Sequence, residues 1–333
     1  MKPWMMGVAF AALGMADASG GSALQAQVAQ ADGWVAWQVP MVADAGAPCC
    51  FSSRRGRPAE NGCDLDARVW NFGTDSKHPL HDSTLAVYAH VAKGRINRVR
   101  AVASACRVES AGAIRRLDAV MPAQSVALLA DWLADADAAR NDDDSALAAL
   151  AYHADASATR AIATRAEPGH AREEREQALF WLGQTRGVDG VDIVEHYART
   201  DADPDVREKA VFALSQSHAG DPYARIRAIS RSDRSKHVRS QALFWMAQME
   251  DARALTDITA ALAGETSDDV REQAVFALSQ LKEGQAEDAL TAVVRGDYPR
   301  ETKKQALFWL GESGSPRAIQ ALDEVLAERK PAR

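Results

Sequence analysis

The residues most capable of chemistry in this chain are four cysteines, which all lie in its first third. They are Cys49, Cys50, Cys63 and Cys106. An even number of clustered cysteines is typical of proteins that fold in an oxidising compartment, where thiols pair as disulfides. A bond between the adjacent Cys49 and Cys50 is strained, because neighbouring residues rarely reach the required side-chain geometry. We therefore predict two disulfides in which each of these two pairs with Cys63 or Cys106, in an order that the sequence leaves open.

A metal site is the alternative use of the same cysteines, with His78 or His81 as a further ligand. The usual structural zinc site contains a Cys-x2-Cys knuckle, and the sequence has none. Disulfides therefore explain the cysteines better than a metal does. We expect neither a bound metal nor a cofactor in this chain.

Motifs that mark catalytic or nucleotide-binding sites are absent from the sequence. It contains no His-Glu-x-x-His, no Gly-x4-Gly-Lys and no Gly-x-Ser-x-Gly. The histidines share no recurring position, and we interpret the following as surface residues: His153, His170, His196, His218 and His237. The sequence thus predicts no catalytic residue and no enzymatic activity.

A five-residue phrase returns with a 32-residue period through the second half of the chain. It reads Ala-Leu-Phe-Trp-Leu or a close variant, and it begins at Ala178, Ala210, Ala242, Ala274 and Ala306. A degenerate sixth copy lies one period earlier, at residues 146–150. Each repeat holds two apolar segments with the 3–4 spacing of helices. A period of this size indicates one helix pair stacked repeatedly on itself, each copy burying the apolar face of its neighbour.

Charged residues recur in the same 32-residue register. A base stands three residues before each phrase, at Arg175, Arg207, Arg239, Arg271 and Lys303. An acid precedes the base by six residues in four copies, at Asp201, Asp233, Glu265 and Asp297. The two columns predict ion pairs within the array, and a track for phosphate groups is the alternative. The formal net charge of −7 argues against nucleic acid as a partner.

These columns resemble the HEAT repeat, in the short bacterial form that is also named after phycobilisome lyases. The resemblance covers about residues 140–330 and is carried by Asp-x5-Arg, as from Asp201 to Arg207, by pairs such as Val238-Arg239, and by the helical phrase that follows. It implies a mainly α fold, a right-handed α-solenoid with five clear repeats and one degenerate repeat. It also implies that the acid and base columns form a ladder along the turns between repeats. One HEAT-like enzyme class, the deoxyhypusine hydroxylases, binds iron through His-Glu pairs, and this chain has no His-Glu step.

Aromatic residues occupy two further columns. Phenylalanine is present in every copy, at Phe180, Phe212, Phe244, Phe276 and Phe308. The next position alternates between Trp181, Ala213, Trp245, Ala277 and Trp309. In one interpretation the phenylalanines are core and each tryptophan fills space beside the alanine of a neighbouring repeat.

In the other interpretation the tryptophans line the concave surface of the solenoid and anchor a partner. A glutamine column lies close to them, at Gln184, Gln216, Gln248 and Gln280, and would line the same groove. We expect the tryptophans to be mostly buried, with their edges at the concave surface.

The N-terminal part lacks the 32-residue repeat and shows the sequence patterns of a leader segment and of strands. Residues 1–31 resemble a signal peptide and leader, with Lys2, an apolar stretch at 4–16 and small-x-small sites at 16–18 and 29–31. Residues 32–110 predict a small β-containing domain with a strand at 34–40 and a hairpin at 85–104. Residues 111–333 are predicted to form the solenoid. No run of 18 apolar residues follows the N-terminus, so we expect no transmembrane segment in the mature chain.

These features predict a non-catalytic scaffold of the cell envelope, periplasmic or secreted, that binds a protein or peptide in the groove of its solenoid. A cysteine pair and a hairpin ahead of HEAT repeats is similar to exported bacterial HEAT-repeat proteins. The sequence identifies neither the partner nor the oligomeric state. An accessory lyase or chaperone-like protein that handles a cofactor or client is the alternative. A purely structural spacer fits less well, because the repeat helices are rich in aromatic residues.

We expect the mature chain to begin between about residues 19 and 32 and to be found outside the cytoplasm, because cleavage follows small-x-small sites. N-terminal sequencing of the native protein from fractionated cells measures both properties. An intact Met1 in the cytosolic fraction would contradict this expectation.

Overall fold

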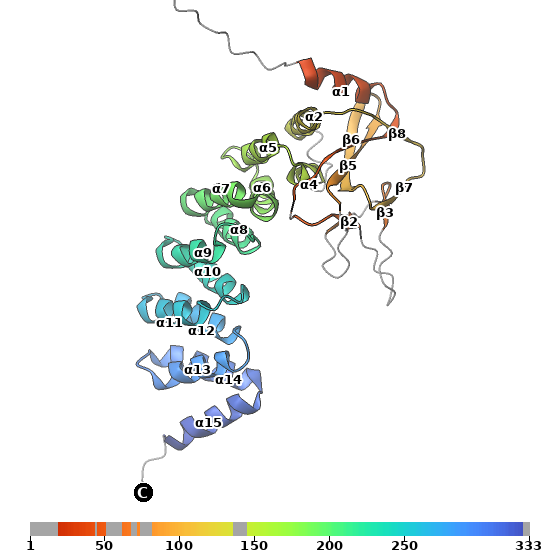
Figure 1. Ribbon diagram of the computed structural model, residues 1–333. Coiled ribbons are helices and arrows are strands. Elements are labelled where there is room, and N and C mark those ends of the chain that lie inside the picture. The colour runs from red at the N-terminus through yellow and green to blue at the C-terminus, as the bar shows by residue number, and fades with distance from the viewer. Residues whose placement is uncertain are drawn as a thin grey trace, which may run out of the picture.

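A small sheet-containing region stands at the N-terminal end of a long array of paired helices (Figure 1). The computed structural model describes residues 19–43, 45–50, 62–67, 72–73, 82–135 and 145–328. The fold class predicted from the sequence, mainly α with a small β-containing part, is confirmed. His78 and His81, which were considered as metal ligands, lie outside the described residues.

Four strands form the main sheet, in the order β6-β5-β1-β8. They are β1 (Gly33–Pro40), β5 (Thr84–Ala92), β6 (Arg95–Ala103) and β8 (Ile114–Arg116). Strand β5 pairs antiparallel with both β1 and β6, whereas β8 pairs parallel with β1. The β5–β6 hairpin turns at Lys93 and Gly94, whose φ angles of 54° and 72° suit the right-handed twist of the strands. Because β8 lies beyond residue 110, the sheet extends past the boundary expected for the N-terminal domain.

The two faces of the sheet bury different side chains, because successive residues of a strand point to opposite sides. Val35, Trp37 and Val39 of β1 join the core that continues into the helices. Trp34 and Ala36 point to the other side, into a cluster that contains all four cysteines. This second cluster is closed by two short strand pairs, β2 (Cys49–Cys50) with β4 (Phe72–Gly73) and β3 (Gly62–Asp64) with β7 (Arg107–Glu109).

Two disulfides hold this cysteine cluster together. One joins Cys49 to Cys106 and the other joins Cys50 to Cys63, and all four residues are buried. Two disulfides without a bond between Cys49 and Cys50 agree with the prediction. The structure adds the order of pairing, which the sequence left open.

The helices of the array form two layers that run side by side (Figure 1). One layer consists of α4 (Ser145–Tyr152), α6 (Arg172–Thr185), α8 (Pro204–Ser215), α10 (Lys236–Gln248), α12 (Asp268–Ser279) and α14 (Arg300–Ser313). The other consists of α5 (Ala156–Ala166), α7 (Gly187–Thr200), α9 (Pro222–Ser232), α11 (Ala254–Gly264), α13 (Gln285–Arg295) and α15 (Pro316–Glu328). The recurring phrase lies on the helices from α6 to α14 in the first layer, on the side toward which the sheet projects.

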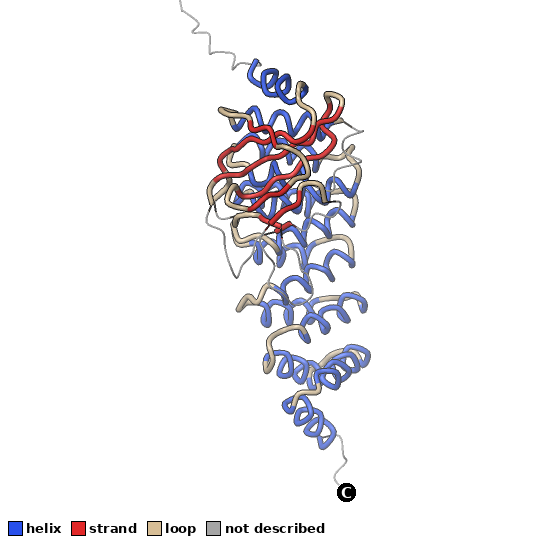
Figure 2. The backbone as a smooth tube through the Cα atoms, turned by 90° about the vertical axis from the view of Figure 1, so that its right-hand side faces the viewer, coloured by secondary structure: helices blue, strands red, loops and turns tan. Residues whose placement is uncertain are grey.

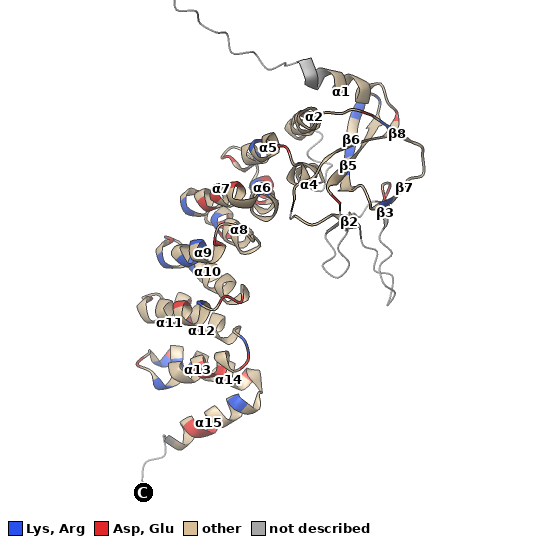
Figure 3. Ribbon diagram, in the orientation of Figure 1, with Lys and Arg blue, Asp and Glu red and all other residues tan. Residues whose placement is uncertain are grey.

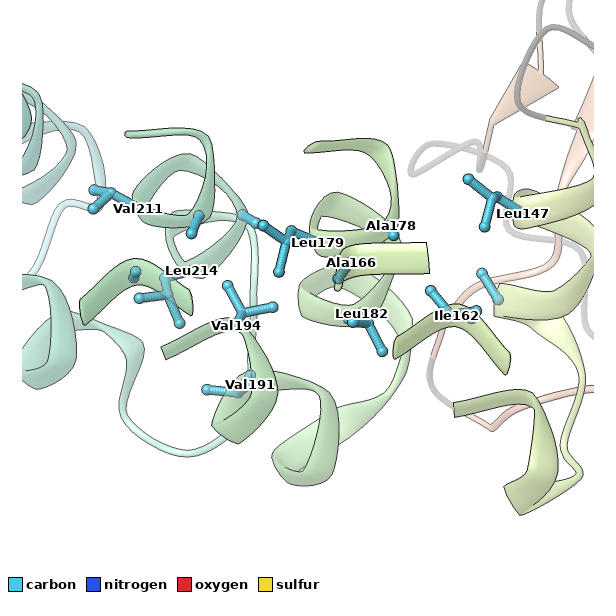
Figure 4. Close-up of a cluster of buried hydrophobic side chains, with 14 of the residues drawn as sticks. Leu147, Ile162, Ala166, Ala178, Leu179, Leu182, Val191, Val194, Val211 and Leu214 are labelled. Atoms are coloured by element: carbon cyan, nitrogen blue, oxygen red, sulfur yellow. The ribbon is translucent and has the colours of Figure 1, made fainter. Parts of the chain in front are cut away.

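A continuous apolar core runs between the layers (Figure 4). Leu179 and Leu182 of α6 are fully buried against Val194 of α7. The same positions are buried in the later repeats, except that Leu307 and Leu322 of the last repeat are half-buried. Helices α6 and α8 approach so closely that a Cβ at Gly183 would lie 2.6 Å from the carbonyl oxygen of Ala213. Each helix pair therefore depends on its neighbours for its core, as the period predicts.

The sheet lies against the first helices of the array (Figure 2). Hydrogen bonds join the two parts, in addition to the shared core. The backbone N–H of Ala154 donates to the carbonyl oxygen of Pro40 at 3.0 Å. Trp37 Nε1 donates to Ser125 Oγ at 2.7 Å, and this hydroxyl lies 3.0 Å from His153 Nε2. The expectation that His153 is a surface residue is wrong, because the residue is fully buried at this junction.

Two helices lie against the sheet region before the array begins, α1 (Ser19–Ala29) and α2 (Pro122–Ala134). Leu24 and Val28 of α1 are buried in the main core, although α1 falls inside the expected leader 1–31. Cleavage after Ala31 would remove these side chains, whereas cleavage after Ala18 would leave α1 whole. Within the expected window, we therefore favour the earlier site.

The buried His153 predicts a pH-dependent junction. Burial lowers the pKa of His153 from 6.5 to about 4, an effect to which Arg186 adds and which Asp155 opposes. The unfolded chain therefore binds the proton first, so that stability falls as pH drops from about 6.5 to about 4, by up to about 3 kcal/mol. Urea unfolding of the native chain and of His153→Gln at several pH values measures this loss. The variant should be less stable at pH 7 and should lose less on acidification, and parallel pH profiles would contradict the prediction.

Candidate functional site

The third residue of each phrase points away from the core, and so does the fourth where it is a tryptophan. The first, second and fifth residues are buried, as Ala242, Leu243 and Met246 are in α10, except that Leu307 in the last phrase is half-buried. Helical geometry then turns Phe244 and Trp245 toward the outer side of the layer, where both are half-buried. The interpretation of the phenylalanine column as core is therefore wrong: four of these residues are half-buried and Phe308 is 53% exposed. We name this surface the aromatic face: Phe180, Trp181, Phe212, Phe244, Trp245, Phe276, Phe308 and Trp309.

The rings of the aromatic face contact one another in an unbroken series across the repeats. Phe180 stacks on Phe212 with centroids 6.0 Å apart, and Phe244 stacks on Phe276 at 6.1 Å. Between these stacks, Trp245 lies against Phe212 at 5.0 Å. The series begins where Trp181 meets the buried Tyr152 at 5.9 Å, and it ends where Phe276 meets Trp309 and Trp309 meets Phe308. Spacings of this size are those of favourable aromatic pairs.

The tryptophans both pack and remain partly accessible. Trp181, Trp245 and Trp309 contact the main core but are only half-buried. The alternating Ala213 and Ala277 are fully buried. Each of Trp245 and Trp309 lies against the phenylalanine of the preceding, alanine-bearing repeat. The ring arrangement therefore repeats every two helix pairs rather than every one.

Amide side chains flank the aromatic face. The glutamine column predicted from the sequence lies four residues after each phenylalanine, on the same side of the helix. Gln184, Gln248 and Gln280 are exposed and Gln216 is half-buried. Gln216 and Gln280 donate to the hydroxyls of the preceding serines, each at 3.1 Å. The column therefore offers acceptor and donor groups at the surface beside the rings.

A second amide column escaped the sequence reasoning. It lies three residues before the phenylalanines, at Gln177, Gln241, Gln273 and Gln305, with Lys209 in the remaining repeat. All of these side chains are half-buried or exposed. These glutamines recur with the 32-residue period and could have been found in the sequence. They indicate a surface only once the phenylalanines are known to point outward. The rings thus lie between two rows of polar side chains.

The charged columns form a ladder between the repeats, with a pairing that differs from the sequence spacing. Arg207 binds both carboxylate oxygens of Asp233, at 2.8 and 3.0 Å, and Arg239 binds Glu265 at 3.1 and 3.2 Å. Arg175 binds one carboxylate oxygen of Asp201 through Nη2, while its Nε donates to the carbonyl oxygen of Ala166. Each of these bases therefore reaches the acid of the next repeat, at a sequence separation of 26, and not the acid that precedes it in its own repeat.

The preceding acid contributes its backbone instead. Arg207 Nη1 donates to the carbonyl oxygen of Asp201 at 2.9 Å, and Arg239 Nη1 donates to that of Asp233 at 2.9 Å. Burial raises the pKa of Asp233, but the hydrogen bonds from Arg207 and from the N–H of Ser235 outweigh it and keep that pKa below 3.8. Each such arginine ties its own turn to the next one.

The ladder changes at the C-terminal end of the array. Arg271 donates to the carbonyl oxygen of Glu265 at 2.6 Å and pairs with Asp268 on its own helix. For Asp297 and Lys303 the structure records no ion pair within the described ranges. Figure 3 shows acidic and basic residues interspersed along both layers.

We searched the described residues for groups of metal-ligating side chains and for helices that could span a membrane. One group of potential metal ligands lies close together, Cys49, Cys63 and Cys106, and their sulfur atoms are engaged in the two disulfides. None of the described helices combines the length and the apolarity needed to cross a bilayer.

A comparison with known families covers the C-terminal part of the array. Residues 223–308 and 255–333 match the family of HEAT repeats, so the C-terminal region consists of HEAT repeats, as the sequence columns suggested. No curated protein matches the chain.

Two solved structures are similar at a low level. Human deoxyhypusine hydroxylase in complex with glycerol is 18% identical, with 63% of this chain and 80% of that chain covered and a TM-score of 0.27. The Escherichia coli protein YibA is 21% identical, with 61% and 77% covered and a TM-score of 0.37. Likeness at this level indicates nothing about activity.

The burial of the ladder predicts graded losses of stability. Arg207→Ala should cost about 3–5 kcal/mol, because it strands the buried carboxylate of Asp233. Arg239→Ala, at a less deeply buried pair, should cost about 1–3 kcal/mol. Arg172→Ala removes an exposed pair with Asp205 and should cost at most about 1 kcal/mol. Chemical denaturation of the three variants measures the order, and equal losses would show that the ladder does not depend on burial.

Proposed function

We propose that the aromatic face binds an extended polypeptide segment of a partner protein, without catalysis. The observation that carries this proposal is the unbroken series of half-buried rings between two rows of amides. Aromatic side chains at a surface provide large apolar contacts with few rotatable bonds, and they are enriched among residues that dominate binding.

The amide rows suit a peptide backbone better than a charged ligand. A glutamine side chain offers both a donor and an acceptor, as does each peptide unit of an extended chain. Exposed charges near the N-terminal ends of these helices are partly neutralised by pairs such as Arg172–Asp205 and Lys236–Asp269. Recognition would therefore combine ring contacts to apolar side chains with hydrogen bonds to the main chain.

The array also supplies length and rigidity. Adjacent packed helices lie about 10 Å apart, so the aromatic face extends about 40 Å from α6 to α14. An extended chain rises about 3.3 Å per residue, and about twelve residues would span this distance. Because the ladder and the core hold the rings in place, little ordering of the binding surface is required on association.

We place this activity in the cell envelope. The leader-like N-terminus and the two disulfides support this location, because disulfides persist in oxidising compartments. The client would be a polypeptide exposed in the same compartment.

Selection of a displayed library of random twelve-residue peptides, followed by calorimetry on the enriched sequence, tests the proposal. Phe244→Ala should weaken binding by at least about tenfold, as expected for an aromatic hot spot. Gln248→Ala should weaken it by a smaller factor, because one neutral hydrogen bond is lost. Val188→Ala, which truncates an exposed apolar side chain on α7 in the other layer, is the matched control and should bind normally.

Two outcomes would count against this function. Enrichment of no peptide, or equal effects of Phe244→Ala and Val188→Ala, would contradict it. Binding of a planar tetrapyrrole without any peptide would favour the alternative of a protein that handles a cofactor.

A further inference from the structure

A hollow of about 490 Å³ lies where the sheet region meets the first full repeats. The loop after β1 forms one wall, through Val42 and Ala45, and Ala154 adds the turn between α4 and α5. The C-terminal end of α6, with Gln184, and the segment that follows α8, with His218, form the other wall. This volume falls in the range of pockets that hold small ligands.

The hollow adjoins the aromatic face. Gln184 belongs to the amide column that flanks the rings, and it also lines the hollow. It lies one helical turn beyond Trp181, the first tryptophan of the series. A chain bound along the aromatic face therefore reaches the hollow at the end nearest the sheet.

Arg186 brings a positive charge to this hollow that no carboxylate pairs with in the described residues. Its guanidinium donates to the carbonyl oxygens of Ala151, His153 and Asp155, at 3.3, 2.5 and 3.1 Å, and to Thr159 Oγ1 at 2.9 Å. These bonds use four of its five N–H donors. The ladder arginines are held by carboxylates, whereas Arg186 is held by neutral oxygens. Burial lowers the pKa of Arg186, and the carboxylates of Asp155 and Asp189 oppose this effect.

Other groups around the hollow also suit an anion. None of the described residues that line it is acidic, while Gln184, His218 and Ser217 are polar residues with N–H or O–H donors. Helix α7 begins at Gly187, directly after Arg186, and Gly187 lines the hollow as well. The N-terminus of a helix carries partial positive charge and free N–H groups.

We propose that this hollow receives the C-terminal carboxylate of the polypeptide that lies along the aromatic face. The inference rests on the proposed function and adds the class and direction of the ligand. A free C-terminus supplies one anionic group at the end of an extended chain, which matches one cation held by neutral oxygens at the end of the row of rings. An amino terminus would instead bring a second positive charge beside Arg186. The partner's chain would run with its C-terminus toward the sheet.

Peptide display in both orientations tests this inference with the full chain. One random library is attached through its N-terminus and ends in a free carboxylate, and the other is attached through its C-terminus. The enriched peptide is then synthesised as the free acid and as the C-terminal amide. We expect enrichment from the first library, and the amide should bind at least about tenfold more weakly, as the loss of a charged hydrogen bond implies.

Substitutions of residues that line the hollow test whether these residues cause the preference for the free acid over the amide. Gln184→Ala combined with His218→Ala should shrink the difference between acid and amide. Gln248→Ala, in the same column but away from the hollow, should weaken both forms by the same factor. Arg186 is left unchanged because it holds the turn between α4 and α5.

The outcomes separate this inference from the proposed function. Equal binding of acid and amide overturns the carboxylate site and leaves peptide binding intact. Enrichment only of peptides with free N-termini also overturns it and would assign the hollow to an amino group. Failure of both libraries to bind overturns the inference together with the function.

Discussion

A buried arginine that binds two consecutive turns at once is the interaction on which the array depends. Arg207 takes the carbonyl oxygen of its own turn and the carboxylate of the next, and its side chain is only 1% exposed. Both bonds must form for the charge to be tolerated in the interior, so the spacing between repeats has little freedom. That fixed spacing brings Phe180 to Phe212 and Phe244 to Phe276 at nearly equal distances. The spacing of the rings on the aromatic face thus depends on the arginine–carboxylate pairs, which lie in the turns between repeats.

Much of this arrangement follows from the sequence, because it depends on local periodicity. The 32-residue register gives the helix pairs, and the Lys93-Gly94 turn gives the hairpin. Four cysteines can form two disulfides in three ways, and two of these ways remain once the Cys49–Cys50 bond is excluded. Each of these inferences needs only residues that are close in sequence or that recur at a fixed spacing.

The remaining features depend on contacts that carry no local signal. Five apolar residues in succession surround a whole helical turn, so the phrase does not reveal that Phe244 points outward. The acid of the same repeat lies nearer to each ladder arginine in sequence, yet the acid of the next repeat is its partner in space. His153 is buried because the sheet covers it, and the partner groups Trp37 and Ser125 are far away in the chain. The sequence does not show that Arg186 is held by neutral oxygens, because its partners are known only from the structure.

The alternation of Trp and Ala gives the array a unit of two repeats. Trp245 lies against Phe212 on a helix that carries the small Ala213, and Trp309 lies against Phe276 beside Ala277. Loss of a single repeat, such as the one that begins at Asp201, would bring the helices of Trp181 and Trp245 side by side, with two large rings where one has room. An array of this kind can therefore lengthen or shorten through gene duplication most easily by whole pairs. We therefore expect that relatives of this chain with longer or shorter arrays differ from it by an even number of repeats.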